Sequence, residues 1–123
     1  MSNTYLHEGL ARDVAAGKRV HIVSFGSGAA RANILGAAGI LRDNITVSKK
    51  NRIPNVTHNS GGKLTGSTHR SPDALRGLSA DRIVLHLTEA WTANGKHDPR
   101  ILDDIYANAQ AAVRTTGGDI INA

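Results

Sequence analysis

Hydrophobic and polar residues follow two different periods along this chain, and each period predicts a different kind of element. In residues 3–16, leucine and valine recur every four residues, which places them on one face of a helix. Gly17 follows this stretch as a helix stop. A second helical pattern covers residues 29–42, and a third begins at Pro99 and ends before Gly117. The helical period therefore predicts a helix in each of these stretches.

Short runs of β-branched and aliphatic residues lie between the helical stretches. Residues 20–25 form such a run and end at a Gly-Ser-Gly sequence, which is typical of a buried strand followed by a tight loop. Residues 82–87 are the most apolar stretch and predict a central strand. From Asn44 to Ser67, apolar residues alternate with polar ones around an Asn-Ser-Gly-Gly turn, which predicts short strands and a hairpin. Residues 119–121 predict a last strand.

Helices that alternate with buried strands favour one architecture. Residues 1–123 are enough for a single domain, and the alternation predicts a three-layer α/β fold in which helices flank a mainly parallel sheet with a β-hairpin insertion. Aromatic residues make up only 3% of the chain, so the core must consist of Ile, Leu, Val and Ala. Gly36 and Gly39 weaken the second helix, and we expect them to permit its close approach to the sheet.

The charge balance of the chain is basic. Lysine and arginine number 15 against 10 aspartate and glutamate, which gives a net charge of +5 and favours an anionic partner such as DNA. The basic residues gather in and after the expected hairpin, where a shared surface would neutralise phosphates: Lys49, Lys50, Arg52, Lys63, Arg70 and Arg76. The alternative is a solvated hairpin without a ligand. The low aromatic content weakens the case for single-strand recognition by base stacking.

Several features of the composition exclude whole classes of function. The chain contains no cysteine, which excludes disulfides, thiolate metal sites and thiol nucleophiles and fits a reducing compartment. No two of its six histidines stand four residues apart, so a helical zinc site is unsupported. No apolar run reaches the length of a membrane span, and the first residues do not form a signal peptide. We therefore expect a cytoplasmic protein without a metal, a cofactor or a membrane partner.

The loop Gly26-Ser27-Gly28 is a candidate anion site. It joins an expected strand to an expected helix, where free backbone N–H groups and the helix dipole suit an anion, and Arg31 lies one turn further on. The glycines also suit a tight turn. A dinucleotide-binding fingerprint would require glycine where Arg31 stands, and the Gly-Lys-Ser/Thr end of a phosphate loop occurs nowhere in the chain. The loop thus predicts either an anion site or a turn.

Two histidines and the single tryptophan lie in or near the expected strands. His21 falls within the first strand, where a hydrogen-bonded core histidine is expected. His86 lies near the end of the most apolar strand, where it is placed to face a cleft. Trp91 follows shortly afterwards, and we expect it to be a buried anchor.

One stretch of the sequence resembles a known family. Residues 71–85, Ser-Pro-Asp-Ala-Leu-Arg-Gly-Leu-Ser-Ala-Asp-Arg-Ile-Val-Leu, resemble the segment that runs into the Walker B strand in the ATPase domain of phage terminase large subunits and related helicase-type motors. The order of the expected elements agrees with that family over nearly the whole chain. The resemblance implies a RecA-like, P-loop-NTPase-like fold.

The chain departs from the family's pattern at the residues that act on nucleotide. The resemblance places the family's phosphate loop upstream of Met1. Where it implies the Walker B aspartate and the catalytic glutamate, the chain has His86 and Leu87, with Glu89 two residues further on. His86 and Glu89 thus form a degenerate Walker B. Without the groups that hold and neutralise the γ-phosphate, we expect no ATPase activity from this chain alone.

Charge and resemblance together predict a function. We expect a non-catalytic phage-type NTPase-like module that binds nucleic acid through the basic residues named above. A second hypothesis is a module that binds a phage or host protein, or a second copy of itself, through a sheet edge. A third is a nucleotide or phosphate binder that uses Gly26, Gly28 and Arg31 and is completed by another chain.

Overall fold

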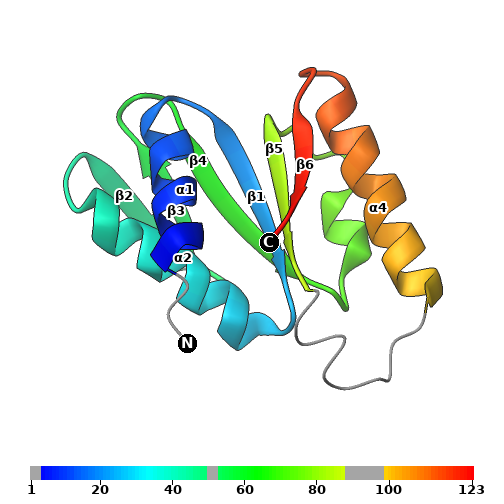
Figure 1. Ribbon diagram of the computed structural model, residues 1–123. Helices are drawn as coiled ribbons and strands as arrows, with labels where there is room; N and C mark the ends of the chain where they lie inside the picture. Colours follow the sequence, from blue (N-terminus) through cyan, green and yellow to red (C-terminus); the bar gives the residue numbers. More distant parts are fainter. Residues whose placement is uncertain (1–3, 50–52, 88–98) are drawn as a thin grey trace.

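The computed structural model describes residues 4–49, 53–87 and 99–123, in which helices and strands alternate (Figure 1). Along the chain the elements are α1 (Thr4–Ala15), β1 (Arg19–Ser24), α2 (Ser27–Leu41), β2 (Ile45–Ser48), β3 (Asn55–His58), β4 (Lys63–Thr68), the 3₁₀ helix η1 (Pro72–Leu75), β5 (Arg82–His86), α4 (Pro99–Arg114) and β6 (Asp119–Asn122). The helices and strands that the hydrophobic pattern predicted are all present. No helix in the described part of the chain is long and apolar enough to cross a membrane.

Parallel strands form the centre and one side of the sheet. The strand order is β2-β3-β4-β1-β5-β6, and β4, β1, β5 and β6 run parallel to one another. Beyond β4, β3 and β2 are antiparallel additions, which confirms the expected hairpin insertion. Since parallel strands end at the same side of a sheet, β4, β1, β5 and β6 define a carboxyl edge, and the opposite side is the amino edge.

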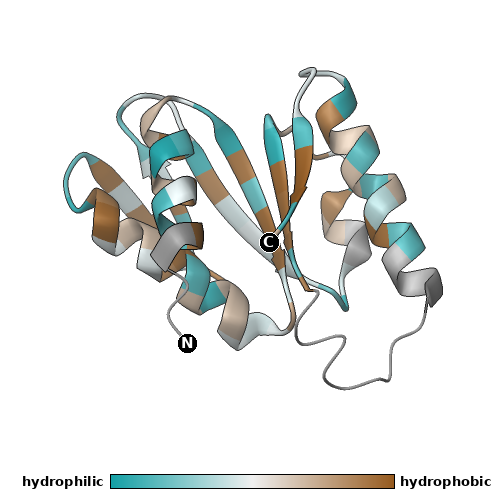
Figure 2. Cartoon of the chain, viewed as in Figure 1, coloured by the Kyte–Doolittle hydropathy of each residue, from teal (hydrophilic) through white to brown (hydrophobic). Residues whose placement is uncertain are grey.

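Helices cover both faces of the sheet. On one face, α1 and α2 pack over Val20, Ile22 and Leu64. On the other face, α4 and η1 pack over Val23 and Ile83. Because successive side chains of a strand point to opposite faces, β1 contributes to both cores, and Figure 2 shows polar and hydrophobic residues along it. The three-layer α/β fold with a mainly parallel sheet is therefore confirmed.

The contact between α1 and α2 depends on Gly36. A β-carbon at this position of α2 would collide with the imidazole ring of His7 on α1. Gly39 is exposed, and a β-carbon there would meet no atom of the described structure within 4 Å. The expectation that both glycines bring the helix close to the sheet is wrong, because the neighbour that Gly36 accommodates is a helix and Gly39 accommodates none.

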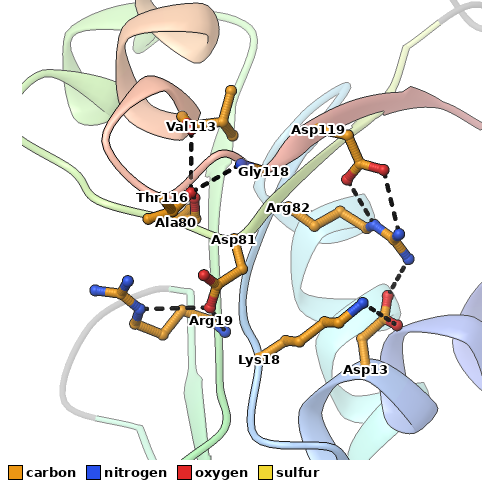
Figure 3. A network of polar contacts seen from close by, with 10 residues as sticks. All are labelled: Asp13, Lys18, Arg19, Ala80, Asp81, Arg82, Val113, Thr116, Gly118 and Asp119. Atoms are coloured by element: carbon orange, nitrogen blue, oxygen red, sulfur yellow. Dashed lines mark hydrogen bonds and ion pairs between the residues drawn. The ribbon is translucent and has the colours of Figure 1, made fainter.

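Ion pairs and hydrogen bonds join several segments at the amino edge (Figure 3). Arg82, at the start of β5, lies 2.7 Å from a carboxylate oxygen of Asp13 in α1 and 2.9 Å from one of Asp119 in β6. Asp81 accepts a hydrogen bond of 2.8 Å from the backbone N–H of Arg19, at the start of β1. The carboxylates of this edge are thus paired, and they tie α1, β1, β5 and β6 together.

Candidate functional site

A depression opens at the carboxyl edge, where β1 and β4 lie side by side. It has a volume of about 720 Å³, and its walls include Gly26, Ser27, Asn55, Gly66 and Arg70. The helix that follows β1 is α2, on one face of the sheet, whereas η1, which follows β4, lies on the other face. In open α/β sheets, ligands bind where neighbouring connections leave to opposite faces. This cavity, termed the β1–β4 depression, is therefore the candidate site.

The amino terminus of α2 forms one wall of the β1–β4 depression. Gly26 precedes the helix with φ 100° and ψ 155°, a conformation that favours glycine, and no side chain of a described residue caps the helix. The first turn, which includes Gly28, contains no acidic residue, and Arg31 is exposed one turn further along. The turn at Gly26 is thus confirmed. The uncapped N–H groups and the helix dipole suit an anion, so an anion site at this helix terminus stays a prediction.

Cations lie at the carboxyl edge without a carboxylate partner. Arg70 is exposed on the wall of the depression. Lys49 is exposed and follows Ser48, which pairs with Asn55 of the same wall. Neither these two cations nor Arg31 forms an ion pair with any residue that the structure describes. Positive charge therefore lies beside the opening of the depression.

The remaining described basic residues of the expected surface lie elsewhere. Lys63 is the first residue of β4, so it lies at the amino edge, a strand's length away from Arg70. Arg76 is exposed directly after η1. The structure therefore divides the shared surface that the sequence predicted, because it brings Lys49 and Arg70 to one edge and places Lys63 at the other.

A buried histidine of β1 contacts Ser67, one of the residues that line the depression. His21 is 4% exposed, and its Nδ1 and Nε2 lie 2.6 Å from Thr65 Oγ1 and 2.8 Å from Ser67 Oγ. Burial lowers the pKa of His21 to about 4, so the imidazole is neutral at pH 7. Ser67 also lines the depression, so the neutral imidazole contacts one residue of its wall. The expectation of a hydrogen-bonded core histidine at this position is confirmed.

Two stacked rings form another part of the wall. The rings of Phe25 and His69 lie 4.2 Å apart between centroids, with an angle of 6° between their planes, and both residues line the depression. Burial, and secondarily the charge of Arg70, lowers the pKa of His69, while a backbone hydrogen bond with Ser24 raises it. Phe25 is partly exposed. A flat ring surface therefore lies near the guanidinium of Arg70.

Asn33 of α2 holds His86 at the end of β5. Its Oδ1 accepts a hydrogen bond of 3.0 Å from His7 Nε2, and its Nδ2 donates to Ser24 Oγ at 3.2 Å and to His86 Nδ1 at 3.0 Å. One buried amide thus joins two helices to two central strands.

Among the described residues, no three His, Asp or Glu side chains gather as metal ligands.

The structure adds residues that the sequence did not single out. Phe25, Gly66 and Ser67 stand near the ends of two strands whose sequence positions gave no sign that the strands are neighbours. These residues can be recognised as parts of one site only once the pairing of β1 with β4 is known. Residues singled out from the sequence that lie outside the described part of the chain are Lys50, Arg52, Glu89 and Trp91.

Comparison with known proteins identifies the fold. No protein-family model and no curated protein matches the sequence. Solved structures with a similar fold include a large terminase from a thermophilic bacteriophage in complex with ADP, with a TM-score of 0.52 and 14% identity. They also include a variant of the ATPase domain of the Thermus phage P74-26 large terminase, with a TM-score of 0.50 and 16% identity. The fold is similar to about half of a phage large-terminase ATPase domain.

This terminase-like fold agrees with the resemblance found in residues 71–85 and confirms the RecA-like architecture that it implied. The matches cover 90% and 97% of this chain, which spans 27% of the first terminase chain and 51% of the second. The likeness concerns the fold, and one fold serves many functions. The function must therefore be argued from the site.

Proposed function

We propose that this chain is a non-catalytic nucleic-acid-binding module that holds phosphates at the carboxyl edge of its terminase-like fold. Two exposed cations beside the β1–β4 depression carry the proposal. At the amino edge, Asp13, Asp81 and Asp119 are engaged by arginines. At the carboxyl edge, Lys49 and Arg70 are exposed and pair with no described carboxylate. Unpaired cations of this kind neutralise the phosphates of a nucleic acid.

Neutral donors beside these cations support the proposal. The first-turn N–H groups of α2 and the hydroxyl of Ser27 suit phosphate oxygens, and the amide of Asn55 adds a further donor on the same wall. Contacts of this kind follow the sugar–phosphate backbone without reading its sequence. The proposed binding is therefore sensitive to salt and tolerant of sequence.

The proposal excludes nucleotide hydrolysis by this chain alone. His86 stands where the resemblance implies a metal-binding carboxylate, and its Nδ1 accepts a hydrogen bond from Asn33. Mg²⁺ prefers oxygen ligands, so an imidazole is a poor substitute for that carboxylate. The residue at this position supports a binding role rather than phosphoryl transfer.

A nucleotide is the second candidate ligand, because one of the matching terminases holds ADP and the depression offers an uncapped helix terminus. Thermal unfolding with millimolar ADP and Mg²⁺ separates the two candidates. A rise in Tm together with no affinity for DNA would favour the nucleotide.

Fluorescence anisotropy of a labelled single-stranded DNA, repeated over a salt series, tests nucleic-acid binding. The double substitution Lys49→Gln and Arg70→Gln removes two of the proposed phosphate contacts. We expect the slope of log affinity against log salt to become shallower by about 1.4, at roughly 0.7 for each contact to a single strand. The affinity at moderate salt falls at the same time.

Lys63→Gln is the matched control, because Lys63 is an exposed cation at the opposite edge, at the start of β4. We expect it to leave the affinity and the salt slope unchanged. The proposal is wrong if the unaltered protein binds no DNA at low salt, or if Lys63→Gln weakens binding as much as the double substitution.

A further inference from the structure

Near its carboxyl end, β4 has backbone groups that point away from β1 and bond to no described strand, and this part of β4 lines the β1–β4 depression. We call this side of β4 its open edge. Pairing between β3 and β4 extends no further than Val56 opposite Leu64. The next residue that would bond in this register is Pro54, opposite Gly66, and proline has no N–H to donate. The ladder between the two strands therefore stops. Gly66 and Thr68 continue β4 along the wall of the depression, and on the side away from β1 no strand of the described residues pairs with them.

This open edge presents a donor next to an acceptor. Lys63 and His69 donate their N–H groups toward β1, so the residues that alternate with them turn their N–H and C=O groups away from β1. Gly66 is one of these, and no described residue bonds its N–H or its C=O. At Thr68, by contrast, the C=O accepts a hydrogen bond of 3.1 Å from Ser71 N–H. Gly66 is thus the one position on this stretch of wall where both groups remain open among the described residues.

The surroundings of Gly66 suit a nucleobase. Every base carries a hydrogen-bond donor next to an acceptor on its Watson–Crick edge, and proteins read unpaired bases at that edge while an aromatic ring stacks on the base. Phe25 supplies a partly exposed ring on the same wall, and His69 stacks on one face of that ring at 4.2 Å. Arg70 and Lys49 lie at the same edge, where phosphates on either side of the base would need neutralisation.

We propose that the β1–β4 depression holds one unstacked nucleobase of a single strand, which hydrogen-bonds to the N–H and C=O of Gly66 and stacks on Phe25. This inference rests on the proposed function and deepens it, because it names single-stranded nucleic acid as the ligand. It also assigns a role to one of the few aromatic residues of the chain.

A peptide strand fits the open edge less well. Addition of a peptide strand requires a row of alternating N–H and C=O groups along the sheet edge. Here Ser71 already occupies the C=O of Thr68, so the row ends after Gly66. One donor and one acceptor are enough for a base but not for an extended peptide.

Two labelled oligonucleotides of equal length separate base binding from phosphate binding. One is a single strand of thymidines, and the other is its fully abasic analogue, which keeps the phosphates and lacks the bases. We expect the thymidine strand to bind about tenfold more tightly than the abasic strand, as one stacked base contributes. The two strands should show the same salt slope. A duplex should bind more weakly than the single strand, because its bases are already paired.

Phe25→Leu should reduce the difference between the two strands while the salt slope stays unchanged. Tyr106→Leu is the matched control, because Tyr106 lies on α4 and outside the depression. Phe25 also packs against a core, so this variant requires a check of its folding. The comparison of the two strands with the unaltered protein needs no variant and stands by itself.

The outcomes separate the two proposals. Equal affinity for the thymidine and abasic strands would overturn the base site and leave phosphate binding intact. Binding of neither strand would overturn the proposed function and the base site with it. If thymidine monophosphate bound as tightly as the strand, the proposal that the ligand is a single strand would be wrong. An alternating valine–aspartate hexapeptide tests the alternative of a peptide strand. If it displaced the labelled strand at lower concentrations than the unlabelled strand does, the site would bind a peptide and the proposal of a base would be wrong.

Discussion

At the scale of single residues, the fold holds His21 in its neutral form. Its two ring nitrogens lie within hydrogen-bond distance of hydroxyl groups, Thr65 Oγ1 and Ser67 Oγ. A hydroxyl either donates or accepts, so a neutral imidazole satisfies both contacts with one N–H and one lone pair. A protonated ring would need a counter-charge, and its two recorded side-chain partners are uncharged. Burial therefore lowers its pKa to about 4.

The lowered pKa of His21 predicts a loss of stability in mild acid. In the unfolded chain the imidazole binds a proton below its ordinary pKa of 6.5, whereas in the fold it binds one only below about 4. The free energy of unfolding should therefore fall as the pH drops from 6.5 to 4, by about 3 kcal/mol from this group. Urea unfolding across this range measures the loss.

The variant His21→Gln removes the titrating group and keeps one hydrogen-bonding side chain. We expect its unfolding free energy to depend less on pH between 6.5 and 4 than that of the unaltered protein. An unchanged pH dependence would show that His21 is not the group responsible.

At the scale of elements, the two helices on the first core meet through a small residue and a polar bridge. Gly36 makes room for the ring of His7, and Nε2 of the same ring donates to Asn33. Asn33 in turn contacts Ser24 and His86 on two strands. The position of α1 is thus coupled to the centre of the sheet through the ring that Gly36 accommodates.

Alanine at the two glycines of α2 should have opposite effects. Gly36→Ala should destabilise the protein by about 1–3 kcal/mol, since its β-carbon forces the His7 ring away from Asn33. Gly39→Ala should stabilise it by up to about 1 kcal/mol, because alanine favours the helix and the site is open. Chemical denaturation of the two variants measures both effects.

The double variant His7→Ala and Gly36→Ala tests the cause. If the collision with the ring is responsible, Gly36→Ala should cost less in the His7→Ala background than in the unaltered protein. Additive effects of the two substitutions would contradict this explanation.

At the scale of the whole molecule, the ion pairs in the described part of the sheet gather at its amino edge, where Lys63 is also exposed. The amino edge holds paired charges, in which Arg82 joins α1, β5 and β6. The carboxyl edge holds the exposed cations Lys49 and Arg70 beside an uncapped helix terminus. The net charge of +5 does not locate these cations, because it is a sum over the whole chain.

The ion pairs of the amino edge predict that two substitutions there lower the free energy of unfolding by different amounts. Arg82→Met leaves Asp13, whose side chain is 14% exposed, without its closest cation, and we expect a loss of about 1–3 kcal/mol. Asp119→Asn removes a partner whose side chain is 55% exposed, and we expect a loss below about 1 kcal/mol. Urea unfolding at pH 7 compares them, and equal losses would contradict the importance of the buried pair.

Acid should remove the contribution of Asp119. The hydrogen bond from Arg82 lowers the pKa of this carboxyl below its ordinary value of 3.8. The pair therefore contributes fully above that value, and its contribution disappears as the pH falls through the lower pKa of the folded state. The difference between Asp119→Asn and the unaltered protein should shrink accordingly.

Sequence periodicity was sufficient to place the helices and strands. Leu6, Leu10 and Val14 recur at the helical spacing of α1, and the apolar run of residues 82–87 contains β5. Such patterns are local, because a helix or a strand repeats its own geometry within a few residues. The resemblance in residues 71–85 added the RecA-like architecture. The expected fold was accordingly right in its elements and layers.

The candidate site could be predicted only in part. Gly26 and Arg70 were named from the sequence, and both line the β1–β4 depression. Lys63 was grouped with Arg70 because they are close in sequence. Strand β4 lies between them, however, and an extended strand of this length separates its ends by roughly 20 Å. Proximity in sequence is misleading when the intervening residues are extended.

Local patterns in the sequence were enough to predict the helices and strands, the aliphatic core and the basic balance of the chain. The tertiary structure alone decided that β1 lies beside β4, that Pro54 ends the ladder opposite Gly66, and that Phe25 shares a wall with Arg70. Local sequence patterns and strand order depend on interactions over different distances along the chain. Periodicity acts over one or two turns of chain, whereas strand order follows from how apolar faces far apart in sequence pack against one another.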